Sequence, residues 1–447
     1  MPNIKIDFNT SNGIVKPMHA VNNGPAGSRI RNGNSTFQYF KEAGIPYARN
    51  HDASFCQYYG GEYTVDVHRI FTDFNADPED PRNYDFEMTD MCVADTLSVG
   101  TKVFYRLGAS IEHGKKKGTF PPADFKKWAI ICEHIIRHYN EGFADGFNYG
   151  IEYWEIWNEP DCYNADGSNP CWQGTEEQFA EFFATAFCHL KEKFPHLKLG
   201  GPAFSSIRSN PKKDRFIDLV FTELNKRGAK LDFFSFHRYT NEPAAFRPII
   251  DRAKEIVETY GHNNAELILN EWNYIRGWRG DDWTYSMRSE KGLKGASFTT
   301  GCMCVGQQSP LDMLMYYDAR PCAMNGMFDT DFLTPLKGYY PFKMFNEHYK
   351  MGESVTPEYQ ENPLYCTAAK DDTKMGIMLT NFDENDQAPT QNVTLSLTGL
   401  RKGAKIEKYI LDETYDCELT ETIDVTDEKM DITFDLPLFT VAQFIIK

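Results

Sequence analysis

The sequence predicts an α/β fold, a (β/α)8 TIM barrel followed by a smaller antiparallel β-sandwich domain. Two observations lead to this prediction. Between about residues 14 and 350, short apolar runs alternate with segments of helical periodicity, which is typical of parallel strands joined by crossover helices. From about residue 353 onward, short alternating runs are separated by turn-rich stretches instead, which is typical of antiparallel β structure.

Eight apolar runs are expected to form the barrel strands, because eight parallel strands with helices between them close into a barrel. The helical segments between the runs carry recognisable start and stop signals. Thr175 precedes an acidic first turn, as in a capping box, and Gly261 follows the end of another periodic segment. Residues 125–137 have a clear amphipathic pattern. The expected strands are residues 19–22, 45–49, 101–106, 153–159, 197–200, 233–237, 267–270 and 311–316.

The tail is expected to form the antiparallel domain, and residues 4–8 are expected to add a strand to it from the N-terminus. The sequence therefore divides into residues 1–13, a strand that joins the β domain, residues 14–350, the barrel, and residues 351–447, the β-sandwich. The expected tail strands are residues 364–370, 375–381, 392–397, 406–411, 430–434 and 440–446.

The composition excludes several classes of protein. The chain has 447 residues with 41% hydrophobic side chains, so a large core can form, and its net charge of −17 disfavours nucleic acid and anionic membranes as partners. Its 11 cysteines show no CxxC or Cys/His zinc spacing. We therefore expect reduced thiols, no metal and no cofactor. A secretory signal is not visible at Met1, so a cytoplasmic location is expected.

Two glutamates stand at the ends of two matched runs. Glu159 ends the fourth expected strand and Glu271 directly follows the seventh, and each comes after an asparagine, Asn158 or Asn270. Glu155, four residues before Glu159, is expected to face the barrel interior as a structural ion partner. A β/α barrel carries its chemistry at the C-terminal ends of its strands. Two carboxylates there are what hydrolysis of a glycosidic bond requires. A helix cap or turn would explain Asn158-Glu159-Pro160 alone, but the second matched strand end favours a catalytic pair.

The segment around Glu159 resembles a known motif. Trp154–Asp161 is similar to the acid/base motif of the retaining β/α-barrel glycosidases, and more narrowly to that of glycoside hydrolase family 39, the β-xylosidase and α-L-iduronidase family. Phe234–Tyr239 and Asn270–Trp272 resemble the sixth- and seventh-strand signatures of that family. Arg49 and His51 lie where related proteins have a second-strand arginine and a histidine.

The resemblance implies a role for each residue. Glu159 would be the general acid/base, Glu271 the nucleophile, and Asn158 a donor to the sugar 2-hydroxyl. His237 and Tyr239 would flank the nucleophile, and Arg49 would keep it ionised. Asn22, after the first strand, is an expected sugar contact, although turn chemistry explains it equally well. Trp172, Trp278 and Trp283 are expected in loops after the fourth and seventh strands as candidate sugar platforms, although loop anchoring explains them equally well. The expected substrate-binding residues are thus Asn158, His237, Tyr239, Arg49, His51, Asn22, Trp272 and Trp278.

The favoured hypothesis is a retaining exo-glycosidase that cleaves short plant-wall oligosaccharides, with β-xylosidase activity as the first choice. An α-L-arabinofuranosidase, an arabinobiosidase or an α-L-iduronidase-like enzyme would keep the mechanism and change the sugar. A transglycosylase and a non-catalytic carbohydrate-binding protein are further alternatives. The expected partner is an oligosaccharide or a small glycoside, and a homo-oligomer is left open.

Overall fold

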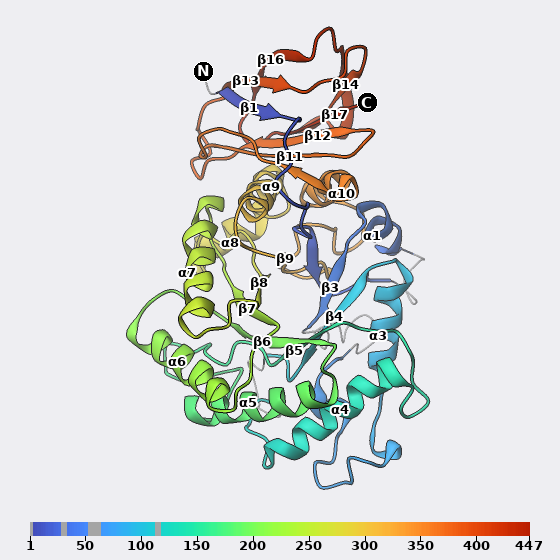
Figure 1. Cartoon of the computed structure of the whole chain (residues 1–447), viewed down its shortest axis with the longest axis vertical. Coiled ribbons are helices and arrows are strands. Elements are labelled where there is room, and N and C mark those ends of the chain that lie inside the picture. Colours follow the sequence, from blue (N-terminus) through green and yellow to red (C-terminus); the bar gives the residue numbers. More distant parts are fainter. Residues whose placement is uncertain (1–2, 28–33, 52–63, 112–117) are drawn as a thin grey trace.

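Eight parallel strands close into a barrel, as the sequence predicts. The computed structural model describes residues 3–27, 34–51, 64–111 and 118–447. Figure 1 shows the barrel in the lower part of the molecule. Its strands neighbour one another in sequence order and are β2 (Ala20–Asn22), β3 (Tyr47–Asn50), β4 (Lys102–Leu107), β5 (Tyr153–Ile156), β6 (Lys198–Phe204), β7 (Phe233–His237), β8 (Glu266–Glu271) and β9 (Met313–Tyr316).

The barrel interior changes from apolar to polar along the strands. Phe104, Tyr153, Phe233 and Ile268 form one cluster near the N-terminal ends. Side chains two positions further on point to the same side of a strand, and these are Arg106, Glu155, Ser235 and Asn270, all fully buried. The interior is therefore plugged by aromatic and aliphatic groups at one end and lined by hydrogen-bonding groups at the end where catalysis occurs in barrels.

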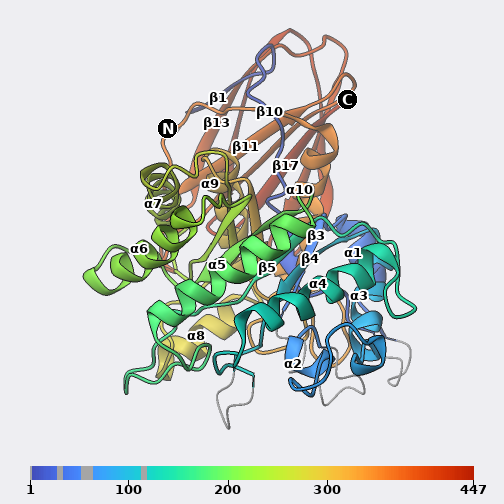
Figure 2. The same ribbon diagram turned by 60° about the horizontal axis from the view of Figure 1, so that its bottom comes forward.

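Helices surround the barrel (Figure 2). The capping box predicted at Thr175 is present. The Thr175 hydroxyl accepts a hydrogen bond from the backbone N–H of Gln178, and the Gln178 side-chain oxygen accepts one from the backbone N–H of Thr175. No described helix is both long and apolar enough to cross a membrane. The helices are α1 (Phe37–Ala43), α2 (Val67–Ile70), α3 (Glu87–Ser98), α4 (Phe125–Glu141), α5 (Glu176–Lys193), α6 (Pro211–Lys226), α7 (Phe246–Thr259), α8 (Gly280–Ser289), α9 (Leu293–Gln307) and α10 (Tyr340–Met351).

The remaining strands form two sheets that face each other. One has the order β1-β13-β16 and the other the order β10-β11-β12-β17-β14-β15. Side chains of both sheets share one core, in which Ile4 and Leu395 meet Ile377 and Phe444. These strands are β1 (Asn3–Asp7), β10 (Glu353–Val355), β11 (Leu364–Lys370), β12 (Met375–Asn381), β13 (Gln391–Thr398), β14 (Lys405–Leu411), β15 (Asp416–Asp424), β16 (Lys429–Leu436) and β17 (Val441–Ile446).

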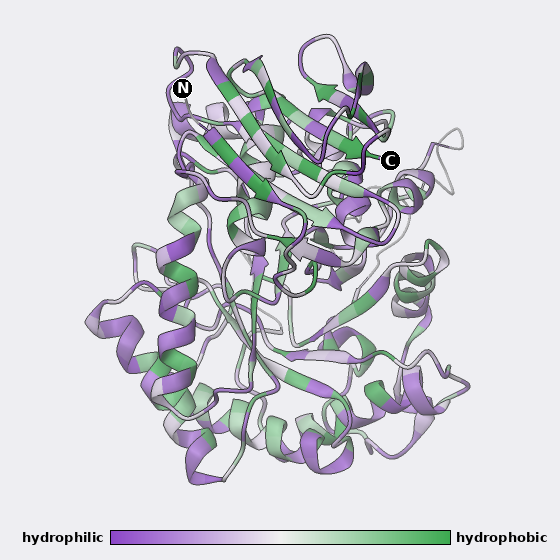
Figure 3. Cartoon of the chain, turned by 45° about the horizontal axis from the view of Figure 1, so that its top comes forward, coloured by the Kyte–Doolittle hydropathy of each residue, from purple (hydrophilic) through white to green (hydrophobic). Residues whose placement is uncertain are grey.

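The central strands of the six-stranded sheet, β11, β12 and β17, are buried on both faces. One face belongs to the sandwich core, and the other packs on α9 and α10, which lie between the barrel and the sandwich (Figure 1). This explains why β12 is buried at every position, since a strand covered on both sides has no solvent face. Figure 3 shows hydrophobic and hydrophilic residues along the strands of the sandwich, and many hydrophilic residues on the outer helices. The division at residues 13/14 and 350/351 stays a proposal, which the strand positions support.

The structure departs from the predicted elements at β1, at β10 and β15, and in α8. β10, a strand of three residues, was not predicted. β1 pairs with β13 in parallel, so the C-terminal domain is not purely antiparallel. β15 was not predicted, because it is an edge strand whose exposed residues are mostly charged or polar and lack apolar alternation. Trp283, expected in a loop, lies on α8.

Candidate active site

The backbone after β5 turns sharply to present Glu159. The strand ends at Ile156, three residues earlier than predicted, and both Trp157 (φ 75°) and Glu159 (φ 45°) have left-handed backbone conformations. Such conformations are costly for residues with a side chain and persist only where the surroundings hold them. Here the Glu159 amide donates to the carbonyl of Ala203, 2.9 Å away at the end of β6. The turn therefore points the carboxylate into the barrel mouth.

Glu271 is the last residue of β8 and lies among hydrogen-bond donors. Arg49 Nη1 donates to Oε1 at 2.7 Å, and the Tyr239 hydroxyl donates to Oε2 at 2.9 Å. His51 Nε2 lies 3.3 Å from Oε1. Burial alone would raise the pKa of Glu271, but His237, His51 and Arg49 outweigh it and hold the pKa well below its usual range. Glu271 is therefore a carboxylate at neutral pH.

His237 lies between the two acids. Its Nδ1 is 2.8 Å from Glu159 Oε1 and 3.5 Å from Glu271 Oε2. One oxygen of each carboxylate and one ring nitrogen of His237 lie within 4.8 Å of one another. Burial lowers the pKa of His237, and the charge of Glu271 opposes this shift. A proton on Nδ1 faces the two carboxylates.

Arg49 connects Glu271 to Glu155 and Asn158 through the barrel interior. Its Nε donates to Glu155 Oε2 at 2.6 Å, and its Nη2 donates to Asn158 Oδ1 at 2.6 Å. Because the side-chain oxygen of Asn158 already accepts a hydrogen bond from Arg49, its NH2 group is oriented for donation to a ligand. Glu155, expected from its spacing to be a structural ion partner, has that role, since it also accepts from Ser235 and Asn270.

His51 is oriented by residues that sequence analysis did not place in the site. Arg106 Nε donates to His51 Nδ1 at 3.0 Å, so the His51 proton lies on Nε2, facing Glu271. Arg106 Nη2 in turn donates to Asp66 at 2.7 Å. No sequence pattern marks Asp66. Arg106, the last residue of the expected third strand, was compatible with an ordinary ion pair.

Two expected substrate contacts lie away from the mouth. Asn22 is fully buried and supports Arg49: its Nδ2 donates to the Asn270 carbonyl at 2.8 Å, and its Oδ1 accepts from Arg49 at 3.1 Å. Trp272 is also fully buried and packs on Phe246, at 5.6 Å between ring centroids. Asn270 and Glu271 both face the barrel interior, because the pairing of β7 with β8 shifts by one residue at this point, and Trp272 then points to the outside of the barrel wall. The structure therefore does not bring Trp272 to the sugar site.

Trp278 lies beside the mouth and is 57% exposed. Its ring meets the edge of Tyr239, with 5.0 Å between centroids, and stacks on Trp283 at 5.8 Å. Trp172, the other expected platform, is 1% exposed and belongs to the core, which fits loop anchoring. The expected contacts that the structure gathers around Glu159 and Glu271 are Arg49, His51, Asn158, His237, Tyr239 and Trp278.

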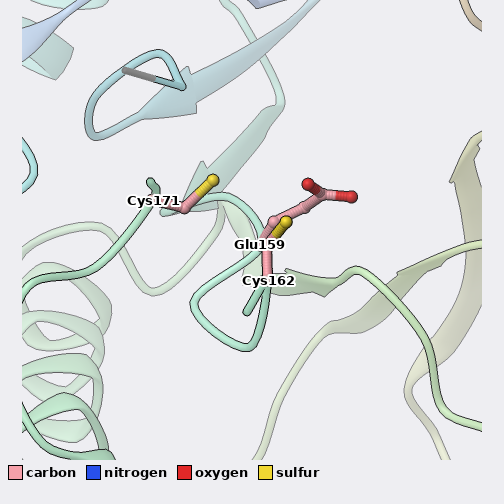
Figure 4. A group of neighbouring side chains, drawn as sticks. All are labelled: Glu159, Cys162 and Cys171. Carbon is pink, nitrogen blue, oxygen red and sulfur yellow. The ribbon is translucent and has the colours of Figure 1, made fainter. Parts of the chain in front are cut away.

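A second group of ligand-type side chains surrounds Glu159. Figure 4 shows the thiols of Cys162 and Cys171 beside it, both on the segment after β5. One donor atom from each of these residues lies within 4.8 Å of the others. Such donors suit a soft ion such as Zn²⁺, whereas hydrolysis by two carboxylates needs none. The expectation that no metal takes part stays a prediction.

The chain is similar to known glycosidases in sequence. Residues 50–271 match the model of glycosyl hydrolases family 39. A β-xylosidase of Geobacillus stearothermophilus is 26% identical over 188 residues, which are 39% of this chain and 34% of that protein. The match thus spans about a third of the length of this curated relative. The matched family segment includes Glu159 and ends at Glu271.

Solved structures share the whole fold. A glucosidase from Croceicoccus marinus has a TM-score of 0.80 at 20% identity, covering 100% of this chain and 99% of that one. A monomeric β-xylosidase from Caulobacter crescentus CB15 has a TM-score of 0.72 at 15% identity, covering 100% and 99%. These likenesses concern the fold, whereas the family follows from the matched segment, which contains both Glu159 and Glu271. The chain belongs to glycosyl hydrolase family 39.

Proposed function

We propose that this protein is a retaining exo-glycoside hydrolase with β-xylosidase activity on short plant-wall oligosaccharides. One observation carries the proposal: an ionised Glu271 and Glu159 stand at the ends of β8 and β5, with an oxygen of each within 4.8 Å. Retaining enzymes hold their carboxyl groups about 5–5.5 Å apart, whereas inverting enzymes leave room for a water molecule at about 6.5–9.5 Å. The close approach favours direct attack by a carboxylate.

The reaction proceeds by double displacement. Glu271 attacks the anomeric carbon while the bond from that carbon to the leaving oxygen breaks, and Glu159 gives its proton to that oxygen. Glu159, now a carboxylate, then takes a proton from a water molecule whose oxygen attacks the same carbon and releases Glu271. Both residues return to their starting states.

The surrounding side chains give Glu271 and Glu159 different roles in the reaction. Arg49, His51 and Tyr239 hold Glu271 in place and favour its charged form. Asn158, oriented by Arg49, donates to a sugar hydroxyl next to the reacting carbon. His237 contacts both acids, so it keeps Glu159 close to the bond that it protonates.

The low exposure of Glu159 and Glu271 supports action on the terminal sugar of an oligosaccharide. The Glu159 and Glu271 side chains are only 14% and 7% exposed. A covered pair suits a terminal sugar better than the middle of a long chain. Trp278, exposed beside Tyr239, is placed to stack with the next sugar. The sequence similarity to a β-xylosidase supports xylose as the sugar.

A cytoplasmic location is part of the proposal, and the oligomeric state stays open. Ten described cysteines are free thiols, which suits a reducing compartment. Size-exclusion chromatography with light scattering measures whether the chain forms a homo-oligomer.

Release of nitrophenol from a panel of aryl glycosides tests the proposal. The panel contains the β-xyloside, β-glucoside, α-L-arabinofuranoside and α-L-iduronide, and the β-xyloside should be cleaved fastest. Glu271→Ala should lower kcat by about 10⁴-fold or more. Glu159→Ala should lower it by about 10²–10⁴-fold, and less for a dinitrophenyl leaving group, which needs no proton.

Three outcomes discriminate between the alternatives. Fastest cleavage of the arabinofuranoside or iduronide would leave the proposed mechanism unchanged but would show that xylose is not the preferred sugar. Unchanged activity in Glu271→Ala would contradict the assignment of the nucleophile. Tight sugar binding without turnover of any glycoside would favour a carbohydrate-binding protein.

A further inference from the structure

A cavity of about 320 Å³ has a lining that includes neither Glu159 nor Glu271. It is bounded by the loop after β6, by the residue that follows β7, and by the first turns of α7 with the short helix before them. Its volume falls in the range of small-molecule sites, which begins at about 300 Å³. The residues that line it are Arg208, Ser209, Arg238, Ala245, Pro248, Ile249 and Arg252.

Arg238 reaches this cavity because of its place in the strand register. It follows His237, which faces the barrel interior, and neighbouring strand residues face opposite sides. The backbone amide of Arg238 donates to the Glu271 carbonyl at 2.9 Å, which fixes its position. The side chain therefore extends outward into the space between β7 and α7.

The positive charges around the cavity are not balanced. Arg252 is paired with Asp214 and Glu255, at 3.0 and 2.7 Å. Within the described ranges, the guanidinium groups of Arg208 and Arg238 make no hydrogen bond or ion pair, and Arg238 Nε is buried without a partner. Burial, followed by the charge of Arg208, lowers the pKa of Arg238 to about 10.

Two neighbouring unpaired cations are unexpected in this chain. The sequence has 64 acidic and 47 basic side chains, so carboxylates are available to pair with most cations. Two like charges held together, one of them half-buried, disfavour the folded state unless an anion compensates them. The nearby start of α7, which has no acidic residue in its first turn, adds a further partial positive charge.

We propose that this cavity binds an oxyanion, a carboxylate, sulfate or phosphate group, through the guanidinium groups of Arg208 and Arg238. Guanidinium groups match such anions in shape and charge and bind them by paired N–H donors. Ser209 adds a hydroxyl to the lining, and Ala245, Pro248 and Ile249 form an apolar wall. That wall suits the carbon skeleton of an organic acid, such as an acidic sugar. The site is separate from the catalytic pair and does not depend on glycosidase activity.

Isothermal titration calorimetry on the full chain tests the proposal. Sodium phosphate, sodium sulfate and sodium glucuronate are titrated at constant ionic strength against a sodium chloride blank, and at least one should show saturable one-site binding. The tightest ligand identifies the source: glucuronate indicates an acidic sugar, and phosphate or sulfate indicates a free inorganic ion. The absence of saturable binding by all three would overturn the proposal.

Charge-matched variants locate the site. Arg208→Gln/Arg238→Gln should weaken binding about tenfold or more, because two charge-assisted contacts are lost. Arg401→Gln/Lys402→Gln removes the same charge from exposed positions of the C-terminal domain and should leave binding unchanged. Equal weakening in both variants would contradict the proposal. If the first pair does not fold, Arg208→Gln alone, at an exposed position, provides the same comparison.

Discussion

At the scale of single residues, Arg49 shows how one buried cation organises the site. A buried charge is tolerable only when it is paired and hydrogen-bonded. Arg49 contacts Glu155, Glu271, Asn22 and Asn158, so its charge is balanced by one structural acid and one reacting acid. The same contacts that stabilise the barrel interior also keep the nucleophile ionised and Asn158 oriented.

His51 should set the acidic limit of activity. Its hydrogen bond contributes to the lowered pKa of Glu271, so activity persists as pH falls until Glu271 gains a proton. His51→Ala removes that contact, raises the pKa of Glu271 and moves the acidic limb of the kcat/KM profile to higher pH. The pH dependence of kcat/KM reports groups of the free enzyme, so steady-state rates across pH measure the shift.

The exposed His196 provides the control, because His196→Ala should leave that limb unchanged. An unchanged acidic limb in His51→Ala would show that His51 does not act on Glu271.

At the scale of elements, strand alternation and close helix packing decide what each segment exposes. In β7 and β8, alternate residues build the polar interior, and the residues between them build the layer under the helices. α9 is different, because nearly all of it is buried between the barrel and the sandwich. Glycines allow it to approach its neighbours: a Cβ at Gly301 would lie 2.8 Å from Pro243 Cγ and 3.3 Å from Tyr365 Cδ2.

Gly301→Ala should therefore destabilise the protein, by about 1–3 kcal/mol for overpacking. Alanine favours a helix by about 1 kcal/mol over glycine, which offsets part of this cost. Gly292→Ala, at the start of the same helix, meets nothing closer than 3.9 Å and should change stability by less than about 1 kcal/mol. Thermal unfolding of both variants measures the difference. Equal melting temperatures would contradict the tight contact at Gly301.

At the scale of the whole molecule, the chain termini close one domain. β1 pairs in parallel with β13, about 390 residues later in the chain. Ile4, Ile6 and Phe8 are buried in the sandwich core. The chain thus begins in the sandwich, forms the barrel, and returns to the sandwich. The barrel is therefore held between two segments of the same domain.

Ile6→Ala should be strongly destabilising for this reason. Ile6 is 1% exposed, and truncation of a buried isoleucine costs about 2–5 kcal/mol. Lys5→Ala, on the exposed side of the same strand, should change stability by about 0.5 kcal/mol or less. Chemical or thermal unfolding of the two variants gives the comparison. Similar effects would mean that β1 contributes little to the sandwich core.

Much of this protein is determined by local sequence pattern. Period-two and helical periodicity are local properties, so the eight barrel strands, the capping box at Thr175 and most sandwich strands could be predicted. The positions of Glu159 and Glu271 followed from their matched strand ends, since closing a barrel brings such ends together.

Tertiary structure alone decided the rest, because it depends on contacts between distant segments. The line from Asp66 through Arg106 to His51 joins three separate parts of the chain, and no local pattern marks it. Trp272 faces the core because the pairing of β8 with β7 shifts by one residue just before it, which strand alternation does not predict. Arg208 and Arg238 form one cavity only because β6 and β7 are neighbours in the closed barrel.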